Sequence, residues 1–180
     1  MNDRRGLASH ADSYADSYFA DKTTKQRITE AEGEEASCKA FGYLRGLQDR
    51  ALAVRFCFRS GNSICLPYGW LGPWEYNPSV GLLVKFTGDA VLLVLIRGSN
   101  LDAQVGGASV NLTDRGLQRH RIVWVREMDE DELRRAGEGE PTVDGIDMAA
   151  FLSQEKMREW VSRMAPAFLE GPLIAQVAQE

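Results

Sequence analysis

The sequence predicts a mainly β fold, a small and strongly bent antiparallel barrel or sandwich with a short N-terminal helix and a C-terminal helix. Two stretches, 51–71 and 80–98, alternate large apolar residues with polar or small ones, which is the two-residue period of a strand. Each stretch is interrupted by turn residues, Ser60-Gly61-Asn62 in the first and Gly88-Asp89 in the second. Short turns without helical crossovers favour antiparallel pairing.

Length and composition place this fold in a single ordinary domain. The chain has 180 residues, of which 44% are hydrophobic and 26% charged, enough for a real core. It has no apolar run of about 18 residues, as a membrane span needs, and the first 30 residues lack the apolar stretch of a secretory signal. Three cysteines, an odd number, fit a reducing compartment. We therefore expect a cytoplasmic protein without a membrane partner.

Charge is segregated along the chain. Residues 36–126, the predicted β-rich core, carry a net charge of +6, residues 1–35 carry −3 and residues 127–180 carry −8. The first segment lacks apolar periodicity and repeats Ala-Asp-Ser-Tyr in tandem, so we predict a disordered acidic leader. Residues 127–141 are predicted to be an acidic loop, and residues 142–180 a strand and helix packing on the core. The acidic flanks either screen the basic core, fold over it, or keep the chain soluble.

The first elements follow from local spacing. Phe41, Leu44 and Leu47 recur near the helical period and predict a short helix over 36–48. In the first hairpin, a three-residue loop at 60–62 gathers the large apolar side chains on one face. That register pairs Phe58 with Ile64, Phe56 with Leu66 and Val54 with Tyr68. It also sets Cys57 opposite Cys65 on the other face, where we expect two reduced thiols.

The later elements follow in order. Glycine and proline predict an aromatic loop over 68–79, and the unbroken apolar run Ala90–Ile96 predicts a strand that is buried on both faces. We expect further strands at 101–105, 121–127 and 142–148. A helix is predicted over 153–165, with Ser153 as N-cap, Pro166 as its end and one apolar stripe. The stripe consists of Met157, Trp160, Val161 and Met164. The apolar stretch 168–177 is expected to dock on the rest.

Four aromatic residues in the predicted loop are the first candidate binding residues. They are Tyr68, Trp70, Trp74 and Tyr76. Exposed aromatic rings beside arginines stack on bases or anchor partner proteins. In the other interpretation, these rings plug the open end of a small barrel.

Arginines supply the second set of candidates. Arg55 and Arg59 have the same parity and are expected on the outer face of the first hairpin, with Cys57 between them. Arg97 and Asn100 belong to a tight turn after an apolar strand, a place where such side chains can grip a phosphate or a base edge. The alternatives are an ordinary solvated sheet face and an ordinary turn.

Signals for catalysis and for metals are missing from the sequence. His10 and His120 are isolated, there is no C-x-x-C pair, and no nucleophile or phosphate-loop motif is present. The acidic run Glu127–Glu132 lacks the glycine and the spacing of a calcium loop. We therefore expect no catalytic residue, no metal and no cofactor, and a protein that is not an enzyme.

Residues 40–105 resemble the Sm-like small barrels. The resemblance is carried by a short helix, a bent hairpin, and a second hairpin that ends in Ile96-Arg97-Gly98-Ser99-Asn100-Leu101. It implies a ring-forming barrel that often binds RNA, with Arg97 in the loop used for the nucleotide pocket. In place of the family's Asp-x-x-Met-Asn type of loop, this chain has the aromatic stretch 68–79. The chain is also similar to small uncharacterised bacterial proteins with an Arg-Gly-x-Asn-Leu segment.

Three functions remain as hypotheses. The first is a non-catalytic interaction or assembly module, whose contact surfaces are Trp70, Trp74 and the helix Met157–Met164. The second is an RNA-binding small barrel that uses the basic face and the aromatic loop, with affinity that falls steeply with salt. The third is an enzyme whose site forms only on oligomerisation. A protein partner or self-association is expected first, and nucleic acid second.

Overall fold

The computed structural model describes residues 35–175, so the predicted leader and its tandem repeat lie outside the described residues, except for Glu35. Two sheets form the fold, and the mainly β prediction is confirmed. Sheet A has the order β1 (Glu35–Ser37), β2 (Phe41–Leu44), β8 (Ile122–Arg126), β3 (Ala53–Cys57) and β4 (Ser63–Pro67). Sheet B has the order β5 (Leu71–Asn77), β6 (Gly81–Thr87), β7 (Val91–Arg97) and β9 (Gly145–Phe151). In this part of the chain the strands form two separate sheets and no closed barrel.

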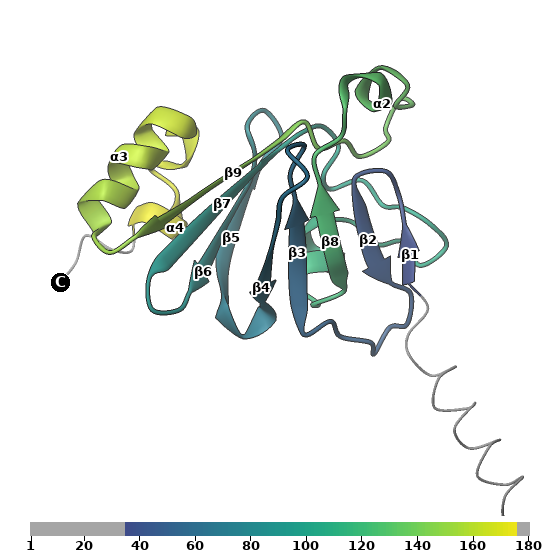
Figure 1. Cartoon of the computed structure of the whole chain (residues 1–180), viewed down its shortest axis with the longest axis horizontal. Coiled ribbons are helices and arrows are strands. Elements are labelled where there is room, and N and C mark those ends of the chain that lie inside the picture. The colour runs from purple at the N-terminus through teal and green to yellow at the C-terminus, as the bar shows by residue number, and fades with distance from the viewer. Residues whose placement is uncertain (1–34, 176–180) are drawn as a thin grey trace, which may run out of the picture. The chain divides into compact units, whose positions relative to one another are not determined.

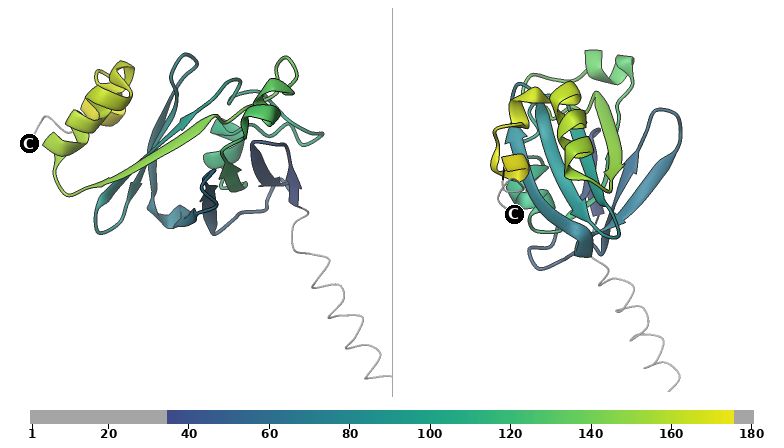
Figure 2. Two further views of the ribbon diagram at one scale, coloured as in Figure 1. Left: turned by 45° about the horizontal axis from the view of Figure 1, so that its top comes forward. Right: turned by 90° about the vertical axis from the view of Figure 1, so that its left-hand side faces the viewer.

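Short helices connect and cover these sheets. They are the α-helices α2 (Glu130–Arg134), α3 (Gln154–Met164) and α4 (Pro172–Ala175), the 3-10 turns η1 (Tyr68–Trp70) and η3 (Pro166–Phe168), and the π-helical turn η2 (Thr113–Leu117). Sheet B lies between sheet A and the helices α3 and α4 (Figure 1). Turned by 90°, the same helices lie against one face of sheet B (Figure 2).

Two apolar cores result from this layering. The first is built by both sheets and the connection before β8; among its fully buried residues are Phe41, Val54, Phe56, Val84, Phe86, Val94, Leu112 and Ile122. The second joins sheet B to the helices and contains Leu83, Leu93, Leu95, Met157, Trp160, Val161, Phe168 and Ile174. Strand β7 contributes to both, which confirms that it is buried on both faces. Helix α3 confirms the predicted C-terminal helix, and the Ser153 side chain caps it.

The first hairpin has the predicted faces but a different register. Phe56 lies opposite Ile64 and Val54 opposite Leu66, two residues away from the predicted pairing. The turn has the expected three residues but lies one position earlier, at 59–61, where the Phe58 amide donates to the Asn62 carbonyl at 2.9 Å. An even shift keeps every side chain on its face. The predicted pairing of Cys57 with Cys65 was wrong, since Cys65 lies opposite Arg55; all three cysteines are free, as expected.

Residues 36–48 form strands β1 and β2, so the predicted N-terminal helix was wrong. Phe41 and Tyr43 are both buried in the first core, and β2 pairs antiparallel with β8. This partner lies about 80 residues further along the chain, beyond the reach of local periodicity. Gly42 and Gly46, which disfavour a helix, are compatible with the strand and the turn after it.

One strand pair departs from the antiparallel prediction. β3 and β8 are parallel, with Arg55 opposite Trp124 and Cys57 opposite Arg126. The long connection between β7 and β8 fills the first core with Leu101, Leu112 and Leu117 before it enters sheet A. The predicted strand at 101–105 is reduced to a single bridge between Val105 and Val110.

The acidic segment after β8 is attached to the basic core rather than forming a free loop. Helix α2 starts at a capping box made by Asp129 and Glu132. The Glu132 carboxylate receives two hydrogen bonds from Arg126, at 2.5 and 2.9 Å. Lys39 also lies 3.7 Å from Glu140. This part of the acidic C-terminal region therefore folds against sheet A.

Candidate functional site

The outer face of sheet A carries the candidate site. The inner face of this sheet packs in the first core, and sheet B has its other face covered by the C-terminal helices. On the outer face lies a shallow hollow of about 620 Å³, whose lining residues all come from the strands of sheet A. They are Glu35, Ala53, Arg55, Cys57, Cys65, Val123, Trp124 and Arg126.

The register of the strands places five residues in one row across this face. Ser37 lies opposite Gly42, Gly42 opposite Trp124, Trp124 opposite Arg55, and Arg55 opposite Cys65. Directly opposite residues in a sheet project to the same side and are close neighbours. The row therefore sets an indole beside a guanidinium, with a small residue on either side of the pair.

Trp124 is held against the sheet by two contacts. A Cβ built on Gly42 would stand 2.2 Å from the indole nitrogen Nε1 and 2.5 Å from Cε2, so the ring rests on the glycine backbone. The same nitrogen donates a hydrogen bond of 2.9 Å to Oε1 of Glu35. One ring face is thus covered by β2, while the indole borders the hollow and stays partly exposed.

The two arginines of the hollow differ in their partners. Arg126 is bound by Glu132, and this hydrogen-bonded pairing lowers the pKa of the Glu132 carboxyl to about 2. Arg55 is exposed, and among residues 35–175 no carboxylate lies within ion-pair distance of it. Arg55 is therefore the cation of this face that is available to an anionic ligand.

Arg59 does not share the outer face with Arg55, contrary to the prediction. β3 ends at Cys57, and Arg59 belongs to the turn that follows. Its guanidinium donates to the carbonyl of Asp144, and its amide donates to Glu127 at 2.7 Å. The tight turn redirects the chain, so Arg59 fastens the hairpin to the segment before β9.

The four aromatic candidates do not form one surface, since residues 71–77 are strand β5 rather than a loop. Tyr68 is buried, donates to the Ile122 carbonyl at 2.8 Å and stacks on His120 at 4.5 Å between ring centroids. Trp74 and Tyr76 pack against the first core. Only Trp70 of this group is substantially exposed, at 45%, and its ring covers Gly88.

Arg97 and Asn100 lie apart from the hollow. Arg97 forms an ion pair with Asp147 on β9. Asn100 has a positive φ of 55°, and its amide nitrogen donates to the Glu140 carbonyl at 3.2 Å. Both side chains are engaged in holding the turn after β7 to the segment 140–147.

A scan against protein-family models finds no match for the chain. Searches of curated proteins and of solved structures find none either. The resemblance to Sm-like barrels stays a prediction, and the site rests on its own geometry.

Trp124 and Arg126 are the site residues that sequence reasoning missed. Alternation within residues 121–127 assigned Trp124 to the same face as Ile122. The pairing of β2 with β8 is irregular between Gly42 and Tyr43, so Ile122 and Val125 are both buried and Trp124 is turned outward. A bulge of this kind reverses the face of the residues after it.

The side chains that line the hollow include groups suited to recognition, above all the indole of Trp124 and the guanidinium of Arg55. No cluster of three or more His, Cys, Asp or Glu side chains suited to a metal ion occurs in residues 35–175. Nor does this region hold a helix long and apolar enough to cross a membrane. The hollow presents a planar ring, a cation and small side chains.

Proposed function

We propose that the protein is a non-catalytic binding module, and that it holds single-stranded nucleic acid on the outer face of sheet A. The observation that carries this proposal is that the Trp124 indole lies in the same row as the exposed guanidinium of Arg55, which has no ion-pair partner among residues 35–175. A base stacks on an aromatic ring whatever its sequence, and a guanidinium beside the ring binds the phosphate.

The surroundings of this pair favour an extended polyanion. Glu35 is used to hold the indole, and Glu132 is used by Arg126, so neither carboxylate is free to oppose a phosphate at Arg55. The positions around this pair hold small residues, namely Gly42, Cys57 and Cys65. They leave room for a nucleic-acid strand to lie across the sheet. Sheet faces with a stacking aromatic residue are a common platform for single-stranded RNA.

The assembly-module hypothesis receives less support from these contacts. Of its proposed contact residues, Trp74 packs against the first core and Met157, Trp160 and Val161 are buried in the second. Trp70 is the exposed one. A protein partner that docks through Trp70 is therefore kept as an outcome of the experiment below, and an enzyme formed on oligomerisation stays an untested prediction.

The test is fluorescence anisotropy of a labelled single-stranded RNA 12-mer, titrated with the full chain at low and moderate salt. Stacking on a single aromatic side chain contributes about 1–3 kcal/mol, so Trp124→Ala should weaken binding by about tenfold or more. Arg55→Gln should lower the slope of log K against log salt by about 0.7.

Matched controls separate this face from the rest of the surface. Trp70→Ala removes an exposed tryptophan outside the hollow, and Arg119→Gln removes an exposed arginine outside it. Both should leave RNA binding unchanged. Absence of RNA binding at low salt, or equal losses with Trp70→Ala and Trp124→Ala, would sink the proposal. Loss of protein association with Trp70→Ala would favour the assembly module instead.

A further inference from the structure

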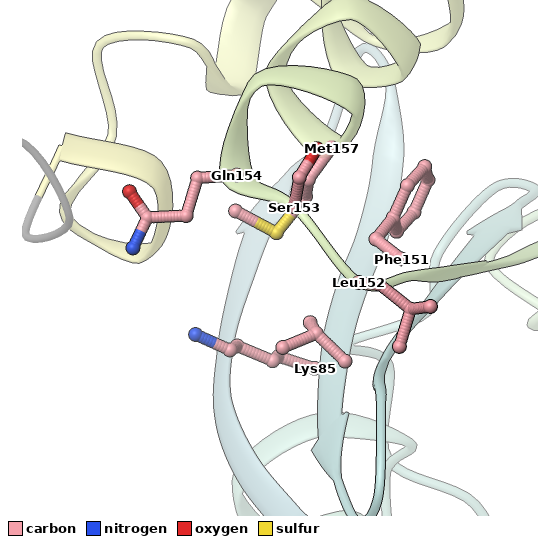
Figure 3. A pocket seen from close by; sticks show the side chains of 7 residues that line it. Lys85, Phe151, Leu152, Ser153, Gln154 and Met157 are labelled. Atoms are coloured by element: carbon pink, nitrogen blue, oxygen red, sulfur yellow. The ribbon is translucent and has the colours of Figure 1, made fainter.

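A second, smaller pocket lies on the opposite side of the molecule's sheets, where β9 leads into helix α3. Its volume is about 240 Å³. Figure 3 draws the side chains that line it and labels Lys85, Phe151, Leu152, Ser153, Gln154 and Met157. Val91, at the start of β7, completes the lining. The pocket belongs to sheet B and the helix layer, so it is separate from the hollow on sheet A.

Lys85 is a cation in apolar surroundings. It lies on the helix-facing side of β6, opposite Leu93, and its neighbour on that side is Leu83. Both leucines are fully buried in the second core. Lys85 is partly buried as a residue, and among residues 35–175 no carboxylate stands within ion-pair distance of its ammonium. A cation without such a partner, at the edge of an apolar pocket, favours an anionic ligand.

Apolar groups form the other side of the pocket. In Figure 3, Met157 is drawn above the Lys85 chain and Phe151 further up on the right, while the Lys85 ammonium extends to the side where Gln154 lies. Leu152 is 92% exposed at the mouth of the pocket. One exposed leucine alone is ordinary, but this one adds apolar surface next to a cavity that already contains an unpaired cation.

We propose that this pocket binds a small monocarboxylic acid with an apolar chain. The carboxylate accepts a charge-assisted hydrogen bond from the Lys85 ammonium, and the chain lies against Met157, Phe151 and Leu152. The Ser153 hydroxyl is already used as the cap of α3, where it accepts from the Lys156 amide at 3.4 Å. Drug-sized ligands occupy pockets of about 300–1,000 Å³, so this volume suits a short-chain acid.

The test is a titration of the full chain with hexanoate, hexanol and hexylammonium, followed by calorimetry and by amide chemical shifts at residues lining the pocket. Hexanoate should bind more tightly than hexanol by about tenfold, since only the acid neutralises Lys85. Hexylammonium should bind least, because it places a second cation beside the first.

Variants make the result specific. Lys85→Met should remove the preference of the pocket for hexanoate over hexanol, while Lys85→Arg should keep it. Lys156→Met is the matched control, since Lys156 is exposed and pairs with Glu159 outside the pocket. Lys85→Met should stay folded, which its melting temperature checks, because the new apolar side chain lies beside the buried Leu83 and Leu93. Equal affinity for hexanoate and hexanol, or unchanged hexanoate affinity in Lys85→Met, would overturn the proposal.

Discussion

The indole of Trp124 rests on the backbone of Gly42, and a single added carbon at position 42 would overlap it. Gly42→Ala would set its Cβ 2.2 Å from Nε1 and 2.9 Å from Cδ1 of that ring. A rigid ring moves as a whole, so the variant should push the indole away from β2 and break its hydrogen bond to Glu35. We expect a loss of stability of about 1–3 kcal/mol and RNA affinity reduced by about tenfold.

The control for this variant is Gly107→Ala, where a Cβ would meet no atom within 4 Å. Urea unfolding reports the stability of both variants, and anisotropy reports RNA binding. If Gly42→Ala kept full affinity for RNA, the position of the indole on the sheet would be irrelevant to the ligand.

A second prediction concerns Arg121, which is 1% exposed and yet charged. Its Nε donates to the Leu44 carbonyl at 2.9 Å, and its Nη2 donates to the Arg45 carbonyl at 2.7 Å. Arg121→Met should leave both carbonyls without these donors and destabilise the fold by about 2–4 kcal/mol. Arg119→Met, an exposed neighbour, should change stability by less than about 0.5 kcal/mol. Equal urea midpoints for the two variants would refute a structural role for Arg121.

The ion pair between Arg126 and Glu132 predicts a dependence of stability on acid. The pKa of Glu132 is lowered from 4.5 to about 2, first by the hydrogen bonds from Arg126 and then by the Asp129 amide. A carboxyl whose pKa is lower in the folded than in the unfolded state stabilises the fold at pH values above its unfolded-state pKa. This contribution disappears as the pH falls through the folded-state pKa.

The stability difference between wild type and Glu132→Gln should therefore be full at pH 7 and should shrink between about pH 4.5 and 2. Urea midpoints measured across this range test it. Glu138→Gln is the control. Its urea midpoint should stay close to that of the wild type at every pH. A wild-type advantage that persisted undiminished at pH 2 would contradict the pairing.

Local alternation predicted the hairpins, because each strand and its partner are separated by a few residues. The presence of the β6–β7 hairpin and the faces of β3 follow from a two-residue period, whereas the register does not. Helix α3 was likewise predictable, since its apolar stripe and its Ser153 cap are both local signals. The β6–β7 hairpin supplies the two central strands of sheet B, and together with α3 it supplies much of the second core.

The candidate site depends on contacts that local patterns do not contain. Arg55 was predicted on the outer face by parity, and it lies there. Trp124 joins it only because β8 pairs in parallel with β3 and because the irregular β2–β8 pairing turns the indole outward. Both features are set by pairing over long sequence separations, where tertiary contacts override local preference.

The last prediction separates structure from binding at Tyr68, one of the aromatic candidates. Burial raises the pKa of its hydroxyl above the ordinary value of 10. The unfolded chain ionises this group more easily than the folded chain, so its contribution to stability is full below pH 10 and is lost as the pH rises beyond it. The free energy of unfolding should therefore fall more steeply with pH above that value.

Tyr68→Phe should remove this part of the loss of stability at alkaline pH. Near neutral pH the variant should be less stable than wild type by about 1–2 kcal/mol, because the Ile122 carbonyl loses its donor. RNA affinity of the folded variant should stay at the wild-type level, since Tyr68 lies in the first core and not in the hollow. Urea unfolding at pH 7 and above pH 10, together with the RNA titration, measures both effects. A variant that folded as stably as wild type but bound RNA poorly would assign Tyr68 to the ligand site.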